Sequence, residues 1–228
     1  PMTVSNSRIA LAAAAHPDDI EFLMAGTLLL LKRNGYDIHM WNIADGSCGT
    51  DSLETDQIVR IRADEAKASA ETAGAMLHPP VTKDIEILYE KWLIAKAAAL
   101  VRRIKPDILL VPSTVDYMED HQNAGRILVT AAFVRGMKNY MTSPPEKPWN
   151  GPVAVYHAMP HGLRDPFRKS IRPGQYVDIG DVLDIKEKML GKHVSQKEWL
   201  DRSQGIGAYV GLMKSMASEV GTMSGRFE

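Results

Sequence analysis

The sequence predicts one α/β domain of the three-layer, Rossmann-like type, in which a mostly parallel sheet lies between two layers of helices. Two observations indicate this fold class. Apolar runs of strand length recur along the chain, and stretches whose apolar residues repeat at helical spacing separate them. Strands that alternate with helices build parallel sheets through right-handed crossovers. The carboxyl ends of the strands then share one edge of the sheet, where such folds bind their ligands.

The first part of the chain contains four expected strands and four expected helices. Pro17 bounds the apolar run at 9–15, and Pro79 ends the second helix because proline cannot continue one. Asn34 and Gly35 supply a turn before the second strand. We expect strands at 9–15, 37–43, 84–88 and 107–111, and helices at 22–31, 57–77, 91–104 and 122–138.

The last third of the chain, from about residue 143, is expected to be less regular, although it belongs to the same domain, which spans 1–228. A proline-rich segment at 143–152 interrupts the alternation of strands and helices. Further strands are expected at 153–157 and 176–179, and further helices at 182–190 and 195–218.

Composition narrows the class of binding partner. The chain has 228 residues, 45% of them hydrophobic, which is enough for one sizeable core. Its 27 basic and 28 acidic residues give a formal net charge of -1, without the basic surface that nucleic acids or anionic membranes require. A small molecule is therefore the expected partner. Cys48 is the only cysteine, which excludes an intrachain disulfide and a cysteine-ligated zinc site and fits a reducing cytoplasm.

We expect a soluble protein, because the apolar runs at 9–15 and 22–31 are far below membrane-spanning length. The run at 9–15 is also too short and wrongly flanked for the core of a signal peptide. The chain begins with Pro1 and ends with Glu228, and we expect a trimmed or partly ordered version of a longer product.

The most informative segment follows the first expected strand. His16, Asp18 and Asp19 lie within one turn there, and a histidine with carboxylates is a donor set that binds metal. The alternative interpretation is an acid-rich helix N-terminus, whose carboxylates cap free N–H groups. The position of this segment at the carboxyl end of a strand favours a metal-binding or catalytic role over a purely structural one.

A second cluster of acids with a histidine follows the fourth expected strand, and it ends in Asp120 and His121. If the first and fourth strands are neighbours in the sheet, His16, Asp19 and His121 converge from two loops onto one point. Three protein ligands and an open position are typical of a catalytic zinc, whose bound water has a pKa of about 7. Asp18 would point elsewhere and is free to act as the general base on that water.

These motifs make the chain similar to the LmbE-like, or PIG-L, family of zinc-dependent N-deacetylases, and the resemblance covers most of the chain. It rests on the His-Pro-Asp-Asp segment at 16–19 and on the acid that follows, Glu21. The resemblance implies an LmbE-like fold, a general base at Asp18 and assembly as a homo-oligomer. The zinc ligands that it implies are His16, Asp19 and His121.

Weaker matches to the family lie elsewhere in the chain. They are Gly26-Thr27, the loop at 45–50, Arg62 with Glu65, and the segment 193–196. Arg62 on an amphipathic helix is by default a surface charge. Its resemblance to the family's active-site arginine favours a contact to substrate or to a buried carboxylate.

One position departs from the family pattern. The second family motif usually reads Asp, any residue, His, any residue, Asp, His, and Met118 stands at its first histidine. In the family that histidine pairs with the following aspartate, here Asp120. We therefore count Asp120 as catalytic and Met118 as a substrate-binding position. A thioether carries no proton and cannot act as a general acid.

Three outcomes of this departure remain open. Asp18 shuttles the proton both ways, another titratable group takes over, or hydrolysis is crippled. The candidates for that other group are His161, His157 and Glu119.

The expected function is a metal-dependent hydrolase that removes an N-acetyl group from an N-acetylglucosamine-type sugar or glycoconjugate by zinc-activated water. Two alternatives stay open. One is an amidase that acts on another N-acyl or thiol conjugate. The other is a sugar-binding protein that keeps the metal but has impaired turnover, and Met118 is the residue that suggests it.

Overall fold

Five parallel strands form one sheet in the computed structural model, which describes residues 7–204 and 208–226. The strands lie in the order β3-β2-β1-β4-β5, and each pair of neighbours is parallel. Their bounds are β1 (Arg8–Ala14), β2 (Tyr36–Asn42), β3 (Met76–His78), β4 (Ile108–Val111) and β5 (Ala154–His157). This parallel sheet with helical connections confirms the predicted fold class.

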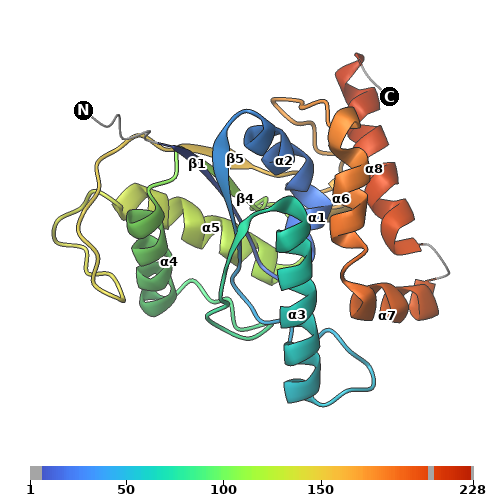
Figure 1. Cartoon of the computed structure of the whole chain (residues 1–228), viewed down its shortest axis with the longest axis horizontal. Coiled ribbons are helices and arrows are strands. Elements are labelled where there is room, and N and C mark those ends of the chain that lie inside the picture. Colours follow the sequence, from blue (N-terminus) through green and yellow to red (C-terminus); the bar gives the residue numbers. More distant parts are fainter. Residues whose placement is uncertain (1–6, 205–207, 227–228) are drawn as a thin grey trace.

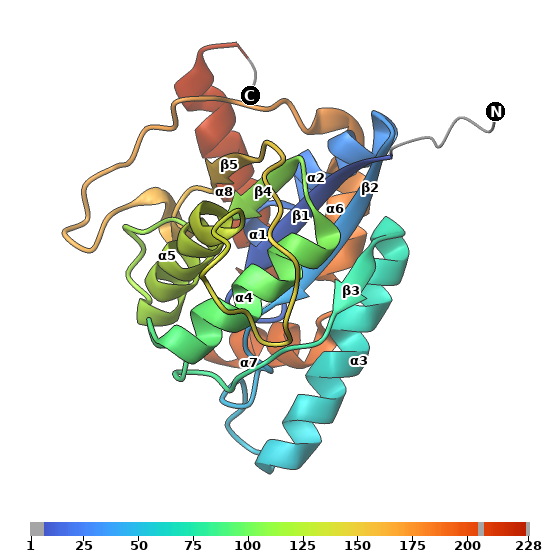
Figure 2. The ribbon, with the colours of Figure 1, turned by 90° about the vertical axis from the view of Figure 1, so that its left-hand side faces the viewer.

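Helices cover both faces of the sheet. Two of them, α4 and α5, lie on one face, while α1, α2, α6 and α8 lie on the other (Figure 1), and the turned view separates the same layers (Figure 2). The bounds are α1 (Asp19–Leu23), α2 (Ala25–Arg33), α3 (Thr55–Ala73), α4 (Lys91–Ile104), α5 (Glu119–Val134), α6 (Leu183–Leu190), α7 (Val194–Gln204) and α8 (Ala208–Ser224). Two short 3₁₀ helices are η1 (His161–Leu163) and η2 (Gly180–Val182).

The strand β1 supplies both halves of the core, because successive side chains of a strand point to opposite faces. Leu11 and Ala13 pack with residues of α4 and α5. Ala10 and Ala12, on the other face, pack with residues of α2, α3 and α6, among them Leu28. The side chain of Leu28 is fully buried. The small alanines of β1 let the helices approach the sheet closely.

The third strand is not where the sequence predicts it. The segment 84–88 forms a loop, and the strand that pairs with β2 is β3. Helix α3 ends at Ala73 instead of continuing to residue 77, because Gly74 adopts the left-handed conformation (φ 61°) that terminates helices. The chain after Gly74 is then free to join the sheet as an edge strand.

Three further expectations about secondary structure are wrong. The helix expected at 22–31 is divided into α1 and α2 at Met24, whose φ of -128° leaves the helical region. The segment 176–179 pairs with no described strand, and Ile179 instead packs its side chain against Gly26 of α2. The helix expected at 195–218 is two helices, α7 and α8; residues 205–207 between them lie outside the described residues.

The first and fourth expected strands are neighbours, which is the condition under which the two acid-histidine clusters converge. β1 pairs with β4 in the register Ala10 with Ile108 and Ala12 with Leu110. The loops that follow Ala14 and Val111 therefore emerge side by side at the carboxyl edge of the sheet. None of the described helices is long and apolar enough to span a membrane.

A close contact between α5 and the loop after β4 fixes the second of these loops, and it can be tested by substitution. A Cβ atom on Gly125 would lie 2.7 Å from the backbone carbonyl oxygen of Pro112, which cannot move away without distorting the loop. We expect Gly125→Ala to lower the free energy of unfolding by about 1–3 kcal/mol in urea denaturation, the usual cost of overpacking.

Gly211→Ala is the matched control. Gly211 lies within α8, and nothing is within 4 Å of a Cβ atom built there. Alanine is expected to stabilise that helix by about 0.5–1 kcal/mol, because glycine loses more conformational freedom on folding. Equal effects of the two substitutions would contradict the role of the Pro112 contact.

Candidate metal centre and active site

The loop between β1 and α1 separates two adjacent carboxylates. Asp18 has a φ of 111°, a left-handed backbone conformation that is strained for any residue other than glycine. Asp19 begins α1, and its Oδ2 atom accepts a hydrogen bond of 2.7 Å from the backbone N–H of His16. The turn at Asp18 therefore directs its side chain away from that of Asp19, as the sequence predicts.

Three of the predicted site residues come together at one point. His16, Asp19 and His121 offer donor atoms that all lie within 4.8 Å of one another. Asp19 is the central member: its Oδ2 lies 3.4 Å from Nδ1 of His16, and its Oδ1 lies 3.2 Å from Nε2 of His121. The expected convergence of the two loops is present, and this group can hold a metal ion.

Each histidine of the group has a second carboxylate on its other ring nitrogen. Asp120 Oδ2 lies 2.9 Å from Nε2 of His16, and Asp116 Oδ2 lies 3.1 Å from Nδ1 of His121. Metal-binding histidines commonly have such an outer carboxylate, which fixes the ring orientation and raises the basicity of the ligand nitrogen. The two acids thus leave Nδ1 of His16 and Nε2 of His121 to face Asp19.

Backbone N–H groups hold the outer carboxylates in turn. Asp120 Oδ2 accepts a hydrogen bond of 2.6 Å from the N–H of Ile85, in the loop that follows β3. Asp116 accepts one of 2.9 Å from the N–H of Met118 and one of 2.6 Å from the N–H of His161. The orientation of the group therefore depends on loops from four parts of the chain.

Strong electrostatic coupling marks this group. Burial alone would lower the pKa of His16, but its hydrogen bond to the Asp120 carboxylate and the charge of Asp19 outweigh burial and raise that pKa to about 10. Asp19 and Asp116 likewise raise the pKa of His121 to about 10 against the effect of burial. His121 holds the pKa of the Asp19 carboxyl well below its usual value, although burial opposes this. The carboxylates thus require positive charge between them.

The donors fit a divalent metal ion. Although carboxylates surround His121, neither of its buried ring nitrogens makes a hydrogen bond of good geometry to a described residue. A bound metal ion would be the partner that such an unpaired ring nitrogen lacks. Two imidazoles and one carboxylate are ligands that zinc takes in catalytic sites.

The second carboxylate of the turn has different partners. Asp18 Oδ2 accepts a hydrogen bond of 2.7 Å from the phenol of Tyr209, and Oδ1 lies 3.6 Å from Nη2 of Arg62. Burial raises the pKa of Asp18, and Arg62 opposes that effect. Asp18 is therefore a partly buried carboxylate, beside the metal group, whose ability to take up a proton exceeds that of an ordinary aspartate.

The contacts of Arg62 bear on its expected role, which is a contact to substrate or to a carboxylate. Its side chain is only 3% exposed, and its guanidinium donates hydrogen bonds to the carbonyl groups of Pro17 and Gly46. Of the two contacts expected for Arg62, the one to a carboxylate is present, and that carboxylate, Asp18, is partly buried.

Tyr209 is a site residue that the sequence did not reveal. It lies in α8, four residues before Met213, and spacing of this kind indicates a core-facing helix rather than a functional position. Its ring packs edge-on against Phe22, with 5.0 Å between the ring centroids. None of the motifs that carry the family resemblance lies in this helix, so the contacts of Tyr209 with Asp18 and Phe22 identify it.

The weaker motif matches form a supporting layer behind the loop. His193 Nε2 lies 3.2 Å from Glu21 Oε1, and both side chains are completely buried. Glu65 of α3 accepts hydrogen bonds of 2.7 Å from both the N–H and the hydroxyl of Ser195. These contacts attach α7 to α1 and α3, and they hold the turn at Asp18 in place.

The structure also places Met118 and its possible substitutes. Met118 is the residue just before α5 and is partly buried. His161 packs its ring against Phe22, with 5.6 Å between centroids, and its N–H binds Asp116. His157 Nδ1 lies 2.8 Å from the carbonyl oxygen of Pro112, and Glu119 is exposed. His161 is the substitute candidate that is directly connected to an outer carboxylate.

The fold and the donor set define an α/β protein whose site combines three residues that can hold a metal ion with a separate, partly buried carboxylate. Comparison of sequences identifies the family. The profile of the family described as PIG-L, GlcNAc-PI de-N-acetylase, matches residues 11–132, and the chain belongs to this family. The resemblance that the two motifs indicate is therefore confirmed.

Two curated relatives carry different activities in their names. The diacetylchitobiose deacetylase of Thermococcus kodakarensis is 27% identical over 211 residues, which cover 87% of this chain and 76% of the relative. The 4-oxalmesaconate hydratase of Pseudomonas putida is 28% identical over 185 residues, which cover 78% of this chain and 69% of the relative. The two are about equally similar to this chain, so identity alone does not choose between them.

Solved structures confirm the fold. The N,N'-diacetylchitobiose deacetylase from Pyrococcus horikoshii superposes with a TM-score of 0.80 at 21% identity, over 97% of this chain and 82% of that chain. The 4-carboxy-2-hydroxymuconate hydratase from Pseudomonas putida superposes with a TM-score of 0.79 at 24% identity, over 95% and 87%.

The outer carboxylates can be tested by metal binding. Because Asp116 holds His121 through its outer nitrogen, we expect Asp116→Asn to weaken zinc binding about 10–100-fold, the usual effect of losing such a partner. Asp19→Ala removes the central ligand and is expected to abolish stoichiometric binding. Competition with a chromogenic chelator measures both affinities.

Asp51→Asn is the matched control, since Asp51 is an exposed acid paired with Arg202 at 3.2 Å. It should bind zinc as the parent does. An Asp116→Asn variant with unchanged zinc affinity and a native circular dichroism spectrum would show that Asp116 does not orient His121.

Proposed function

We propose that this protein is a zinc-dependent N-deacetylase that hydrolyses the N-acetyl group of an N-acetylglucosamine-type sugar or glycoconjugate. One observation carries the proposal: the group of His16, Asp19 and His121 lies next to a partly buried carboxylate, Asp18, that has its own partners. Membership of the de-N-acetylase family and the similarity to a diacetylchitobiose deacetylase support it.

In this proposal His16, Asp19 and His121 hold the zinc ion. Zinc in such a site lowers the pKa of a bound water and polarises a carbonyl group. Asp120 and Asp116 are positioning residues, because each contacts a ligand histidine on its outer nitrogen. This role for Asp120 differs from the catalytic one that the family motif implies, in which it pairs with the histidine that Met118 replaces.

Asp18 carries the proton. It accepts a proton from the attacking water as the bond between the water oxygen and the acetyl carbon forms. It returns that proton to the departing nitrogen as the carbon–nitrogen bond breaks, so that acetate and a free amine leave. Tyr209 and Arg62 hold the carboxylate of Asp18 in one orientation throughout.

Because Met118 replaces the family's histidine, that histidine cannot protonate the departing amine. Asp18 is the first candidate for both proton transfers. His161 is the second, because its backbone is tied to Asp116 and its ring lies beside Phe22. Under the first assignment His161→Gln retains most of the activity, whereas under the second it loses most of it.

The division of labour between the adjacent aspartates gives the sharpest test. Asp18→Asn removes the base but no ligand, so we expect kcat for acetate release from N-acetylglucosamine conjugates to fall about 100-fold or more, a typical loss for a general base. Zinc affinity should stay within about threefold of the parent. Asp19→Asn should instead lose zinc and activity together.

Tyr209→Phe serves as an intermediate case. It removes only the hydrogen bond to Asp18, and we expect a smaller loss of kcat with unchanged zinc content. An Asp18→Asn variant as active as the parent on a panel of N-acetylated sugars would overturn the assignment of the base.

A second candidate function is hydration of an unsaturated carboxylic acid. The observation in its favour is the 4-oxalmesaconate hydratase, which is as similar to this chain as the deacetylase is. Hydration adds water across a carbon–carbon double bond and releases no amine. It therefore needs no group to protonate a departing amine, and Met118 is no obstacle to it. Loss of the absorbance of the conjugated substrate, without acetate or amine release, would assign the hydratase activity.

Other features stay predictions. A panel of N-acyl and thiol conjugates separates the sugar deacetylase from an amidase, and sugar affinity without product identifies a binding protein with impaired turnover. A cytoplasmic location and a homo-oligomeric assembly are also part of the proposal; size-exclusion chromatography with light scattering measures the second.

A further inference from the structure

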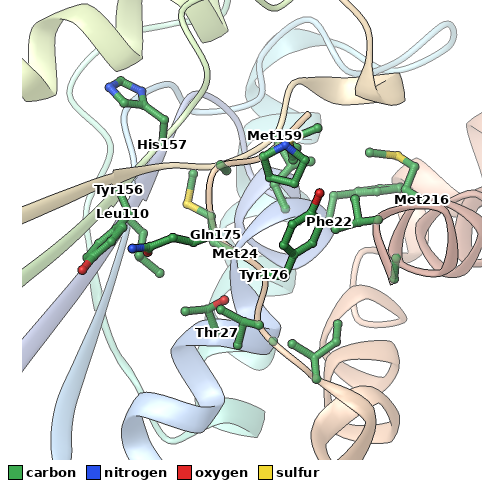
Figure 3. Close-up of a pocket in the computed structure, with 18 of the residues that line it drawn as sticks. Phe22, Met24, Thr27, Leu110, Tyr156, His157, Met159, Gln175, Tyr176 and Met216 are labelled. Atoms are coloured by element: carbon green, nitrogen blue, oxygen red, sulfur yellow. The ribbon is translucent and has the colours of Figure 1, made fainter. Parts of the chain in front are cut away.

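A large cavity lies apart from the metal group. Its volume is about 1020 Å³, at the upper end of the range of about 300–1,000 Å³ for small-molecule sites. It is bounded by β5, α2, α6, α8 and the connection that follows β5 (Figure 3). None of the metal-group residues, nor Asp18, lines it. Phe22 lines the cavity on one side and contacts Tyr209 on the other, so one ring separates the two sites.

Most of the wall is apolar. Figure 3 shows the side chains of Met24, Leu110, Met159 and Met216 around the cavity, and they come from four separate elements or connections. Methionine side chains adapt their shape to a ligand more readily than branched ones, because they are unbranched and polarisable. The wall therefore suits a flexible apolar body.

One buried cation interrupts this apolar wall. Lys186 lies on the inner face of α6 with Met189 and Leu190, and its side chain is only 5% exposed. No carboxylate of a described residue lies within ion-pair distance of its ammonium group, and no described residue accepts a hydrogen bond from it. Burial, without any charged neighbour, lowers its pKa to about 8. The ammonium therefore has no partner on a described residue and can pair with an anion in the cavity.

The other charges of the wall also favour an anion. Arg172 and Lys214 line the cavity, and Asp178 is the one acid among the described lining residues. Asp178 already accepts a hydrogen bond of 3.0 Å from the N–H of Gly180, and Lys214 pairs with Glu187 at 2.6 Å. Among the described lining residues, Lys186 is therefore the cation with a mostly buried side chain and no partner.

We propose that this cavity binds an amphipathic carboxylate, a carboxylate group on an apolar body such as a medium-chain acyl chain, and that Lys186 pairs with the carboxylate. The apolar body fills the space between α2 and α8, and the ammonium supplies a charge-assisted hydrogen bond. The site is independent of the proposed hydrolysis, because the two share no residue with a direct role.

Calorimetric titration of the 228-residue chain with decanoate, and with decanol as the neutral analogue, tests the proposal. We expect decanoate to bind at least tenfold more tightly than decanol. Lys186→Met keeps the length and apolar character of the side chain, and it should weaken decanoate binding at least tenfold while it leaves decanol binding unchanged.

Two further variants make the test decisive. Lys214→Met removes the partnered cation of the same wall and should leave both affinities within threefold of the parent. Ala217→Phe places a large ring in the cavity from α8 and keeps Lys186, and it should block both ligands. It keeps the test usable if Lys186→Met fails to fold.

Three results would overturn the proposal. They are equal affinities for decanoate and decanol, decanoate binding that Lys186→Met leaves within threefold, and the absence of binding by either compound. Binding of an apolar hexapeptide with one glutamate, without binding of decanoate, would also overturn it and would identify the cavity as a peptide site.

Discussion

The pairing of β1 with β4 is the constraint on which the rest of the site depends. Because these strands are neighbours, the loops after Ala14 and Val111 emerge together, and residues more than 100 positions apart in the chain meet. Asp19 then contacts both His16 and His121. A strand inserted between β1 and β4 would separate these donors by about 5 Å more, the spacing of adjacent strands, and would leave no common point for a metal.

Buried negative charge is the second constraint. Asp19, Asp116 and Asp120 surround two histidines in a region with little water, and the raised pKa values of the histidines express the need for positive charge there. A divalent cation satisfies the same need. Asp18 lies outside this group, because its left-handed backbone turns its side chain toward Tyr209 and Arg62. The strained turn thus gives the side chains of two adjacent aspartates different partners.

Sequence reasoning could predict what short-range patterns specify. The strand before His16, the helix α4 and the ligand group all follow from apolar periodicity and from motifs at strand ends. The alternating residues at 84–88 imitate a strand, but Asp84 instead accepts the N–H groups of Gly46 and Cys48, and the N–H of Ile85 is used by Asp120. Tyr209, 191 residues from Asp18, depends on how α8 packs, which no local pattern encodes.

In the proposed zinc site Asp19 is the shared ligand, and outer carboxylates orient His16 and His121. A crystal structure of the zinc-loaded protein, with anomalous diffraction at the zinc edge, tests this arrangement most directly. We predict one zinc ion bound to Nδ1 of His16, a carboxylate oxygen of Asp19 and Nε2 of His121, while Asp120 and Asp116 stay on the outer ring nitrogens. A zinc ion bound instead by Asp18 or Asp120, or coordinated away from His121, would contradict it.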